Sequence, residues 1–159
     1  MSDLNPLWFW LFPLMFAVHD LEEAAFVWLK ERSSGAGSAA RPGARQMLVL
    51  TGLELAILMA ASALAAAPGA SPVAVFAYAV LLGGYTAHGF VHLYRGWRAR
   101  RYTVGEATAM PLVVIGGLFI FAKLVEAEYL SWGAAAASLV LGALLIAPLK
   151  QTARWARLA

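Results

Sequence analysis

Five apolar segments, each about 18–23 residues long, divide this chain of 159 residues. A helix of about 20 apolar residues can cross the hydrocarbon core of a bilayer, and it satisfies all of its own backbone hydrogen bonds there. The segments lie at about 7–29, 46–67, 73–94, 106–126 and 131–149. The sequence therefore predicts an all-α fold, a polytopic membrane bundle of about five transmembrane helices that forms a single domain over residues 1–159.

The composition supports a membrane environment and limits the chemistry. Hydrophobic residues make up 62% of the chain and charged residues only 13%, which leaves too little polar surface to cover a soluble globule. There is no cysteine. Disulfides, thiolate nucleophiles and cysteine-ligated metals are therefore excluded, and any metal ion must be held by imidazole and oxygen ligands.

All basic residues except Lys123 are confined to alternate links between the segments and to the C-terminal tail. They flank the first link, the third link and the C-terminal tail, as Lys30, Arg32, Arg41, Arg45, Arg95, Arg98, Arg100, Arg101, Lys150, Arg154 and Arg157. Cytoplasmic loops retain lysine and arginine, so this pattern predicts an outer N-terminus and a cytoplasmic C-terminus. Asp3, Glu126 and Glu128 then lie on the outer face. The arginine clusters are explained by topology and contact with membrane lipids, and we expect no nucleic-acid partner.

Four ionisable residues interrupt the first apolar segment, in the sequence His19-Asp20-Leu21-Glu22-Glu23. A charge inside a membrane helix costs on the order of 2.5–3.5 kcal/mol, so such residues normally face the bundle interior and find partners there. Positions i, i+3 and i+4 share a helix face, which brings His19, Glu22 and Glu23 together. Asp20 lies about 100° away around the helix, where we expect a proton-relay role.

Two other segments supply matching groups at a similar depth. Glu54 lies in the second segment, and the third carries His88 and His92 at i and i+4, a spacing that can chelate one ion. All of these positions fall in the cytoplasmic half of the membrane when about 1.5 Å is counted per residue. The predicted metal ligands are His19, Glu22, Glu23, Glu54, His88 and His92.

The residue types leave the identity and the number of ions open. Imidazole and carboxylate suit iron, zinc or manganese, and carboxylate-rich helix bundles hold one or two such divalent ions. We expect Glu23 and Asp20 to take catalytic roles as proton acceptors. Whether Tyr85 and Glu106 join the site is not decided by the sequence, although Glu106 at a helix start favours a dipole-compensating role.

The residues His19 to Glu23 resemble the signature of the HXXEE family of small integral membrane proteins. That family also pairs a polar residue, usually asparagine, with a histidine four positions later, where this chain has His88 and His92. A tyrosine–glycine turn follows at Tyr102 to Gly105, with Val104 in place of the usual proline, and it precedes a Thr-Ala helix start at Thr108 and Ala109. The resemblance covers about residues 8 to 125, and it implies a membrane location and a metal site but no established reaction.

These observations predict a metal-dependent membrane enzyme that acts on a lipophilic substrate, located in the inner membrane of a bacterium. An oxidoreductase, including a di-iron one, is slightly favoured over a zinc hydrolase because carboxylates are numerous. The alternatives are a proton- or metal-coupled transporter or sensor, and a structural subunit. In the fifth segment, Ala134, Ser138 and Gly142 recur at four-residue spacing, which predicts close helix packing or the face of a homo-oligomer.

Overall fold

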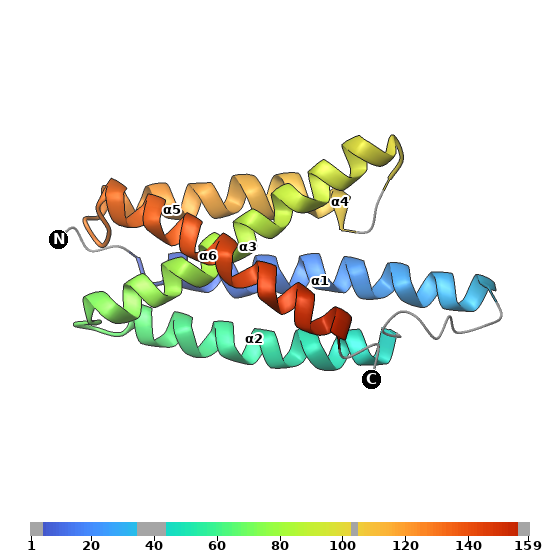
Figure 1. Cartoon of the computed structure of the whole chain (residues 1–159). Coiled ribbons are helices and arrows are strands. Elements are labelled where there is room, and N and C mark those ends of the chain that lie inside the picture. The colour runs from blue at the N-terminus through green and yellow to red at the C-terminus, as the bar shows by residue number, and fades with distance from the viewer. Residues whose placement is uncertain (1–4, 35–43, 103–104, 156–159) are drawn as a thin grey trace.

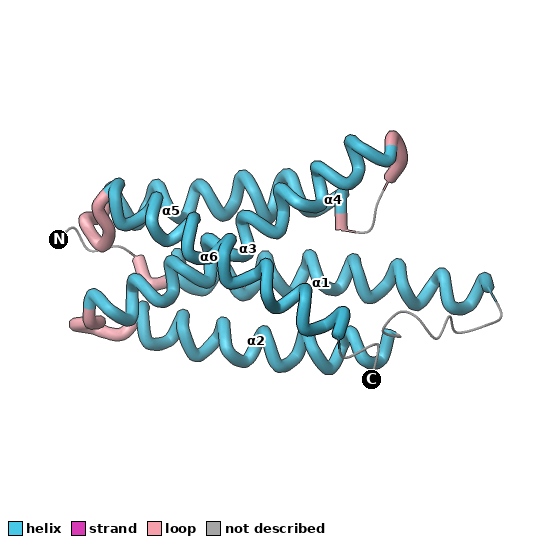
Figure 2. Tube along the Cα trace, viewed as in Figure 1, coloured by secondary structure: helices cyan, strands magenta, loops and turns pink. Residues whose placement is uncertain are grey.

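The computed structural model describes residues 5–34, 44–102 and 105–155 of the chain (Figure 1). These residues form helices joined by short turns, and no strand occurs among them (Figure 2). The element order is α1 (Leu7–Ser34), α2 (Ala44–Ala66), α3 (Pro72–Ala99), α4 (Glu106–Thr108), η1 (Ala109–Gly116), α5 (Gly117–Glu126) and α6 (Trp132–Trp155). The all-helical fold predicted from the sequence is therefore confirmed.

The helices coincide with the five apolar segments, and α1, α3 and α6 continue past their predicted ends. The fourth segment is one helical rod made of α4, η1 and α5, in which η1 is a π-helix of 8 residues. π-Helical turns are rare and occur frequently beside functional sites. Extension of α3 to Ala99 keeps His92 well inside the helix.

Three helices are long and apolar enough to cross a membrane, namely Gln46–Ala66, Pro72–Ala99 and Glu106–Glu126. The first helix has the length, but Asp20, Glu22 and Glu23 interrupt its apolar stretch. The last helix contributes a shorter apolar stretch, Trp132–Leu145, within the part that the structure describes. Three candidate spans are thus established, whereas the predicted total of five and the orientation stay predictions.

The chain runs up and down through the bundle, so the ends of α1 and α3 and the start of α2 lie toward one end (Figure 1). Exposed arginines gather at the end of α3 and just beyond it, at Arg95, Arg98, Arg100 and Arg101. Of the charged residues used to predict the orientation, Asp3, Arg41 and Arg157 lie outside the described residues, as does Val104 of the tyrosine–glycine turn. The side chains of Lys30, Arg45, Lys150 and Arg154 are also not described.

Aromatic side chains hold α1 and α3 apart along most of their shared length. Phe9 and Phe12 of α1 make edge contacts with Tyr78 of α3, and Phe12 and Phe16 contact Tyr85. The Tyr78 and Tyr85 hydroxyls donate hydrogen bonds to backbone carbonyls of α1, at Phe9 and Met15. These buried phenols are satisfied, as buried polar groups require. The aromatic layer ends where the histidines begin, so the two helices are spaced widely enough to hold a cluster of polar side chains.

Glycines bring α3 and α6 into close contact on the other side of α3. A Cβ atom built on Gly142 would lie 2.1 Å from the backbone nitrogen of Gly84 and 2.4 Å from the carbonyl oxygen of Val80. A Cβ atom on Gly83 would lie 2.4 Å from the carbonyl oxygen of Ser138. Small residues permit this backbone approach between membrane helices. Ser138 and Gly142 therefore pack against α3 of the same chain, which is the close helix packing predicted from the sequence. The alternative, the face of a homo-oligomer, stays a prediction.

Candidate metal centre

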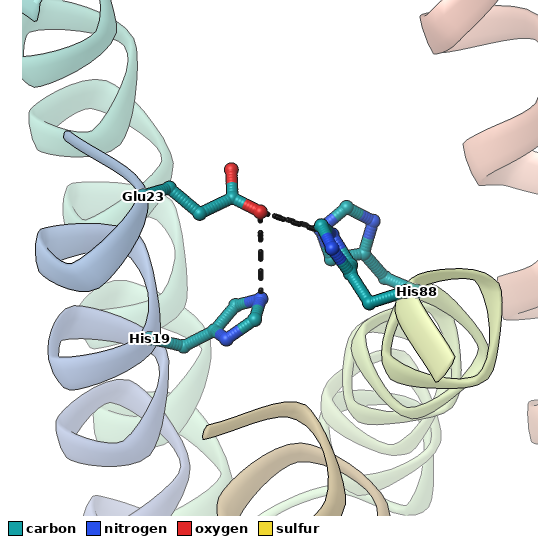
Figure 3. Close-up of side chains that lie close together, drawn as sticks. His19, Glu23 and His88 are labelled. Carbon is teal, nitrogen blue, oxygen red and sulfur yellow. Dashed lines mark hydrogen bonds and ion pairs between the residues drawn. The ribbon is translucent and has the colours of Figure 1, made fainter. Parts of the chain in front are cut away.

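All three histidines of the chain meet one glutamate between α1 and α3. His19 and Glu23 come from consecutive turns of α1, and His88 and His92 come from consecutive turns of α3. Figure 3 shows His19 and Glu23 extending from one helix toward His88 on the other. Each of the four residues offers one ligand atom, and these atoms all lie within 4.8 Å of one another. We call these four residues the His/Glu cluster.

The Glu23 carboxylate is the centre of the cluster. Its Oε1 atom lies 2.9 Å from His92 Nε2, 3.8 Å from His19 Nε2 and 3.9 Å from His88 Nε2. The Nε2 atoms of His88 and His92 are 2.9 Å apart. Two ligands bound to one ion at about 2.0–2.1 Å in a tetrahedron are about 3.3 Å apart. These separations lie on both sides of that value, and all four ligand atoms lie within 4.8 Å of one another, so the side chains would have to adjust to place an ion among these atoms.

Burial and hydrogen bonding also fit a cation. The His19 side chain is fully buried, and its Nε2 atom has no hydrogen-bond partner among the described residues. The Glu23 Oε1 atom is likewise buried without a hydrogen bond there, although it faces three imidazoles. Buried polar atoms are normally paired, and unpaired ones require an explanation. A positive ion between these atoms would satisfy both of them.

The cluster is closed on one side and partly open on another. The exposed fraction is 0% for the His19 side chain and 7% for His92, but it is 17% for Glu23 and 22% for His88. The cluster is therefore most exposed at the Glu23 and His88 side chains.

Gly105 lies directly against the closed side. Its φ is 80°, a left-handed conformation that favours glycine. A Cβ atom at this position would lie 2.7 Å from Glu23 Oε1, 3.0 Å from His19 Cε1 and 3.1 Å from His92 Cε1. Glycine is thus required here for two reasons, backbone conformation and space. The connection from α3 to α4 reaches the cluster because this residue has no side chain.

Glu22 is turned away from the cluster and binds Tyr102, just beyond α3, and Thr108 of α4. Its Oε1 atom accepts a hydrogen bond from the Tyr102 hydroxyl. Its Oε2 atom accepts from the Thr108 hydroxyl at 2.6 Å and from the Thr108 backbone N–H at 3.0 Å. The hydrogen bond to Glu22 raises the pKa of the Tyr102 phenol, because a phenolate could no longer donate it. The ligand role predicted for Glu22 remains untested, but both of its oxygens are engaged elsewhere.

Asp20 and Glu54 also lie outside the His/Glu cluster. Asp20 faces α2, where the Thr51 hydroxyl donates a 2.9 Å hydrogen bond to its Oδ2 atom. Glu54 is an exposed residue of α2, whereas the buried residues of that helix include Thr51 and Leu58. The depth prediction for Glu54 gave no information on the direction in which it points. The predicted ligand role of Glu54 and the catalytic role of Asp20 are not tested by this arrangement.

The sequence did not decide whether Tyr85 and Glu106 join the site, and in the structure both contact neighbouring helices. The Tyr85 hydroxyl is bonded to the Met15 carbonyl at 2.9 Å, and its ring lies edge-on to His19 at 5.9 Å between centroids. Glu106 is in the first turn of α4 and packs over Gly96, whose absent Cβ leaves room for the carboxylate. Tyr85 therefore supports the His19 ring by packing.

Thr108 is the residue of the site that sequence reasoning missed. Its hydroxyl lies 2.6 Å from His19 Nδ1, the imidazole nitrogen that does not face Glu23. The sequence signal is the resemblance of Thr108 and Ala109 to the Thr-Ala helix start of the HXXEE family, and that signal does not indicate which side chain Thr108 contacts. The contact joins residues 89 positions apart in the chain.

A family model described as a protein of unknown function with HXXEE motif matches residues 10–120, which is more than half of the chain. The matched region includes the whole His/Glu cluster together with Glu22 and Thr108. No curated protein and no solved structure matches the chain.

Proposed function

This chain belongs to the HXXEE family, whose description assigns no function, and we propose that it is an integral membrane protein that binds one divalent transition-metal ion. The ligands are His19, Glu23, His88 and His92. The observation that carries the proposal is the convergence of every histidine in the chain on one buried carboxylate oxygen.

One ion fits the donor set better than two. Di-metal sites in helix bundles use about four carboxylates and two histidines, with carboxylates bridging the ions. The described cluster offers one carboxylate and three imidazoles. Glu22 is held by Tyr102 and Thr108, and Glu54 is exposed on α2, so neither supplies a bridge in this arrangement. A single site is therefore favoured over the di-iron centre expected from the number of carboxylates.

The same donor set favours iron or manganese for a catalytic role. Four protein ligands would complete the tetrahedral shell of zinc, which is the arrangement of closed structural sites. Iron and manganese accept further ligands, and such an ion would supply redox or Lewis-acid chemistry at this point. The partial exposure of Glu23 and His88 leaves a side from which a substrate can approach. We extend the proposal to a metal-dependent reaction, most readily an oxidation, on a lipophilic molecule that enters from the bilayer.

Metal analysis of the purified protein tests the binding site. We expect about one ion per chain after loading with iron(II), manganese or zinc, and we expect Glu23→Gln to lower the affinity by at least about 100-fold, since it removes the central charged ligand. Glu54→Gln is the matched control, because it makes the same change at an exposed carboxylate of α2. Equal metal content in both variants and the wild type would rule out the His/Glu cluster as the ligand set.

A second prediction concerns the space beside the ligands. Gly105→Ala should weaken metal binding, because the new Cβ atom would displace Glu23 Oε1 and the His19 ring. Gly69→Ala is the control, since Gly69 has a similar φ of 72° but nothing within 4 Å of its Cβ position. Both variants carry the cost of a left-handed alanine, about 1–2 kcal/mol. A chelator competition assay should show weaker binding only for Gly105→Ala, and equal losses would contradict the assigned contact.

A further inference from the structure

A continuous chain of hydrogen bonds links His19 to a carboxylate on the same helix through a residue of α4. His19 Nδ1 lies 2.6 Å from the Thr108 hydroxyl oxygen, and that hydroxyl donates to Glu22 Oε2 at 2.6 Å. His19 and Glu22 are three positions apart on α1, and among the described residues Thr108 joins their side chains. None of these contacts involves Glu23 or the histidines of α3.

The direction of each bond follows from the donors around Glu22. The Tyr102 hydroxyl donates to Oε1, and the backbone N–H of Thr108, which can only donate, points to Oε2 at 3.0 Å. Glu22 thus acts as an acceptor on both oxygens, and the Thr108 hydroxyl gives its one proton to it. The same hydroxyl can then serve His19 only as an acceptor. His19 must therefore carry its proton on Nδ1.

That tautomer leaves a lone pair on Nε2, the atom that faces Glu23 across 3.8 Å and has no hydrogen-bond partner among the described residues. A histidine that binds a metal ion usually donates its other ring N–H to an oxygen acceptor, which fixes the tautomer and the ring orientation. The Thr108 hydroxyl, itself polarised by Glu22, supplies such an acceptor. A ring that instead carried its proton on Nε2 would direct that proton into the cluster and could not bind an ion there.

We propose that Thr108 and Glu22 are positioning residues of the metal centre, which hold His19 in the Nδ1–H tautomer with its Nε2 lone pair directed at the ion. The role in metal binding rests on the proposed function, but the His19 tautomer is a property of the metal-free protein. It also gives the two glutamates of the family motif different roles. Glu23 is a ligand, and Glu22 acts on another ligand from outside the coordination shell.

The test reads the tautomer and the affinity separately. Nitrogen-15 NMR of the metal-free protein, with histidine labelled, gives only three imidazoles to distinguish, and His19→Ala identifies the signal of His19. We expect Nδ1–H for His19 in the wild type and a loss of that preference in Thr108→Val. Metal affinity, measured by competition with a chelator, should fall about 10–100-fold in the same variant.

Three variants complete the experiment. Thr108→Ser restores the hydroxyl and should restore both the tautomer and the affinity. Glu22→Gln should weaken both the tautomer preference and the affinity. A carboxylate accepts hydrogen bonds on two oxygens, whereas an amide accepts them on one. Thr86→Val is the matched control, since it removes a buried threonine hydroxyl that donates to the Leu82 carbonyl of its own helix and makes no other hydrogen bond in the described part of the chain. It should leave both readouts unchanged.

The outcomes separate this inference from the proposed function. Wild-type protein that binds metal but shows His19 with its proton on Nε2, or with a tautomer indifferent to Thr108→Val, would overturn the positioning role alone. Protein that holds the Nδ1–H tautomer yet binds no metal would overturn the proposed function and the purpose assigned to the tautomer. The wild-type spectrum is informative even if Thr108→Val does not fold.

Discussion

His92→Ala will purify with less than about a tenth of the wild-type metal content, because it removes the imidazole that lies closest to the centre of the His/Glu cluster. Its Nε2 atom is 2.9 Å from Glu23 Oε1 and 2.9 Å from His88 Nε2, so its loss leaves both partners without their nearest neighbour in the cluster. The measurement is elemental analysis of detergent-purified protein after loading and desalting. Circular dichroism of the same samples checks that the helices remain.

The control for His92→Ala is a change of similar size on the same helix that does not touch the cluster. Phe90 is 51% exposed and its side chain has no atom that can bind a metal ion, so Phe90→Ala should keep the full metal content. Metal retained equally by both variants would show that the ion is bound elsewhere. Metal lost from both would indicate a general effect on α3.

Gly142→Ala will lower the stability of the protein in detergent by about 1–3 kcal/mol, as overpacking of a tight interface does. Its Cβ atom would lie 2.1 Å from the nitrogen of Gly84 and 2.4 Å from the carbonyl oxygen of Val80, and backbone atoms cannot move aside as a flexible side chain can. The helices α3 and α6 would have to separate. Thermal unfolding, monitored by tryptophan fluorescence, measures the loss.

Gly52→Ala is the same substitution in the middle of α2, where nothing lies within 4 Å of the Cβ position. Alanine is favoured over glycine inside a helix by about 0.5–1 kcal/mol, so this variant should be as stable as the wild type or slightly more stable. If Gly142→Ala unfolds at the same temperature as Gly52→Ala, the close packing of α3 on α6 is wrong.

The positions of the helices could be predicted from the sequence because they depend on local properties. Length and hydropathy place the segments at about 46–67 and 106–126, and the candidate membrane spans found there are Gln46–Ala66 and Glu106–Glu126. The count of spans could not be settled in the same way. Asp20, Glu22 and Glu23 make α1 ambiguous by composition, although its aromatic contacts with α3 place it inside the bundle.

The candidate site was partly predictable because the spacing of residues along one helix is also a local property. Spacing within one helix places His19 beside Glu23 and His88 beside His92, and the structure brings these two pairs together. Spacing could not separate Glu22 from Glu23, because both lie on the face of His19. The choice between them depends on Tyr102 and Thr108, which are about 80 positions further along the chain.

The His/Glu cluster lies between two pairs of closely packed helices. The most extensive packing in the bundle joins α1 to α2 and α3 to α6, whereas α1 and α3 are separated by the aromatic layer. An ion bound by His19 and Glu23 on one side and by His88 and His92 on the other would fasten these two helix pairs together. Ligands that bind only the folded state stabilise it according to their free concentration. The supply of metal in the cell would then set how firmly the two halves of this protein are held to each other.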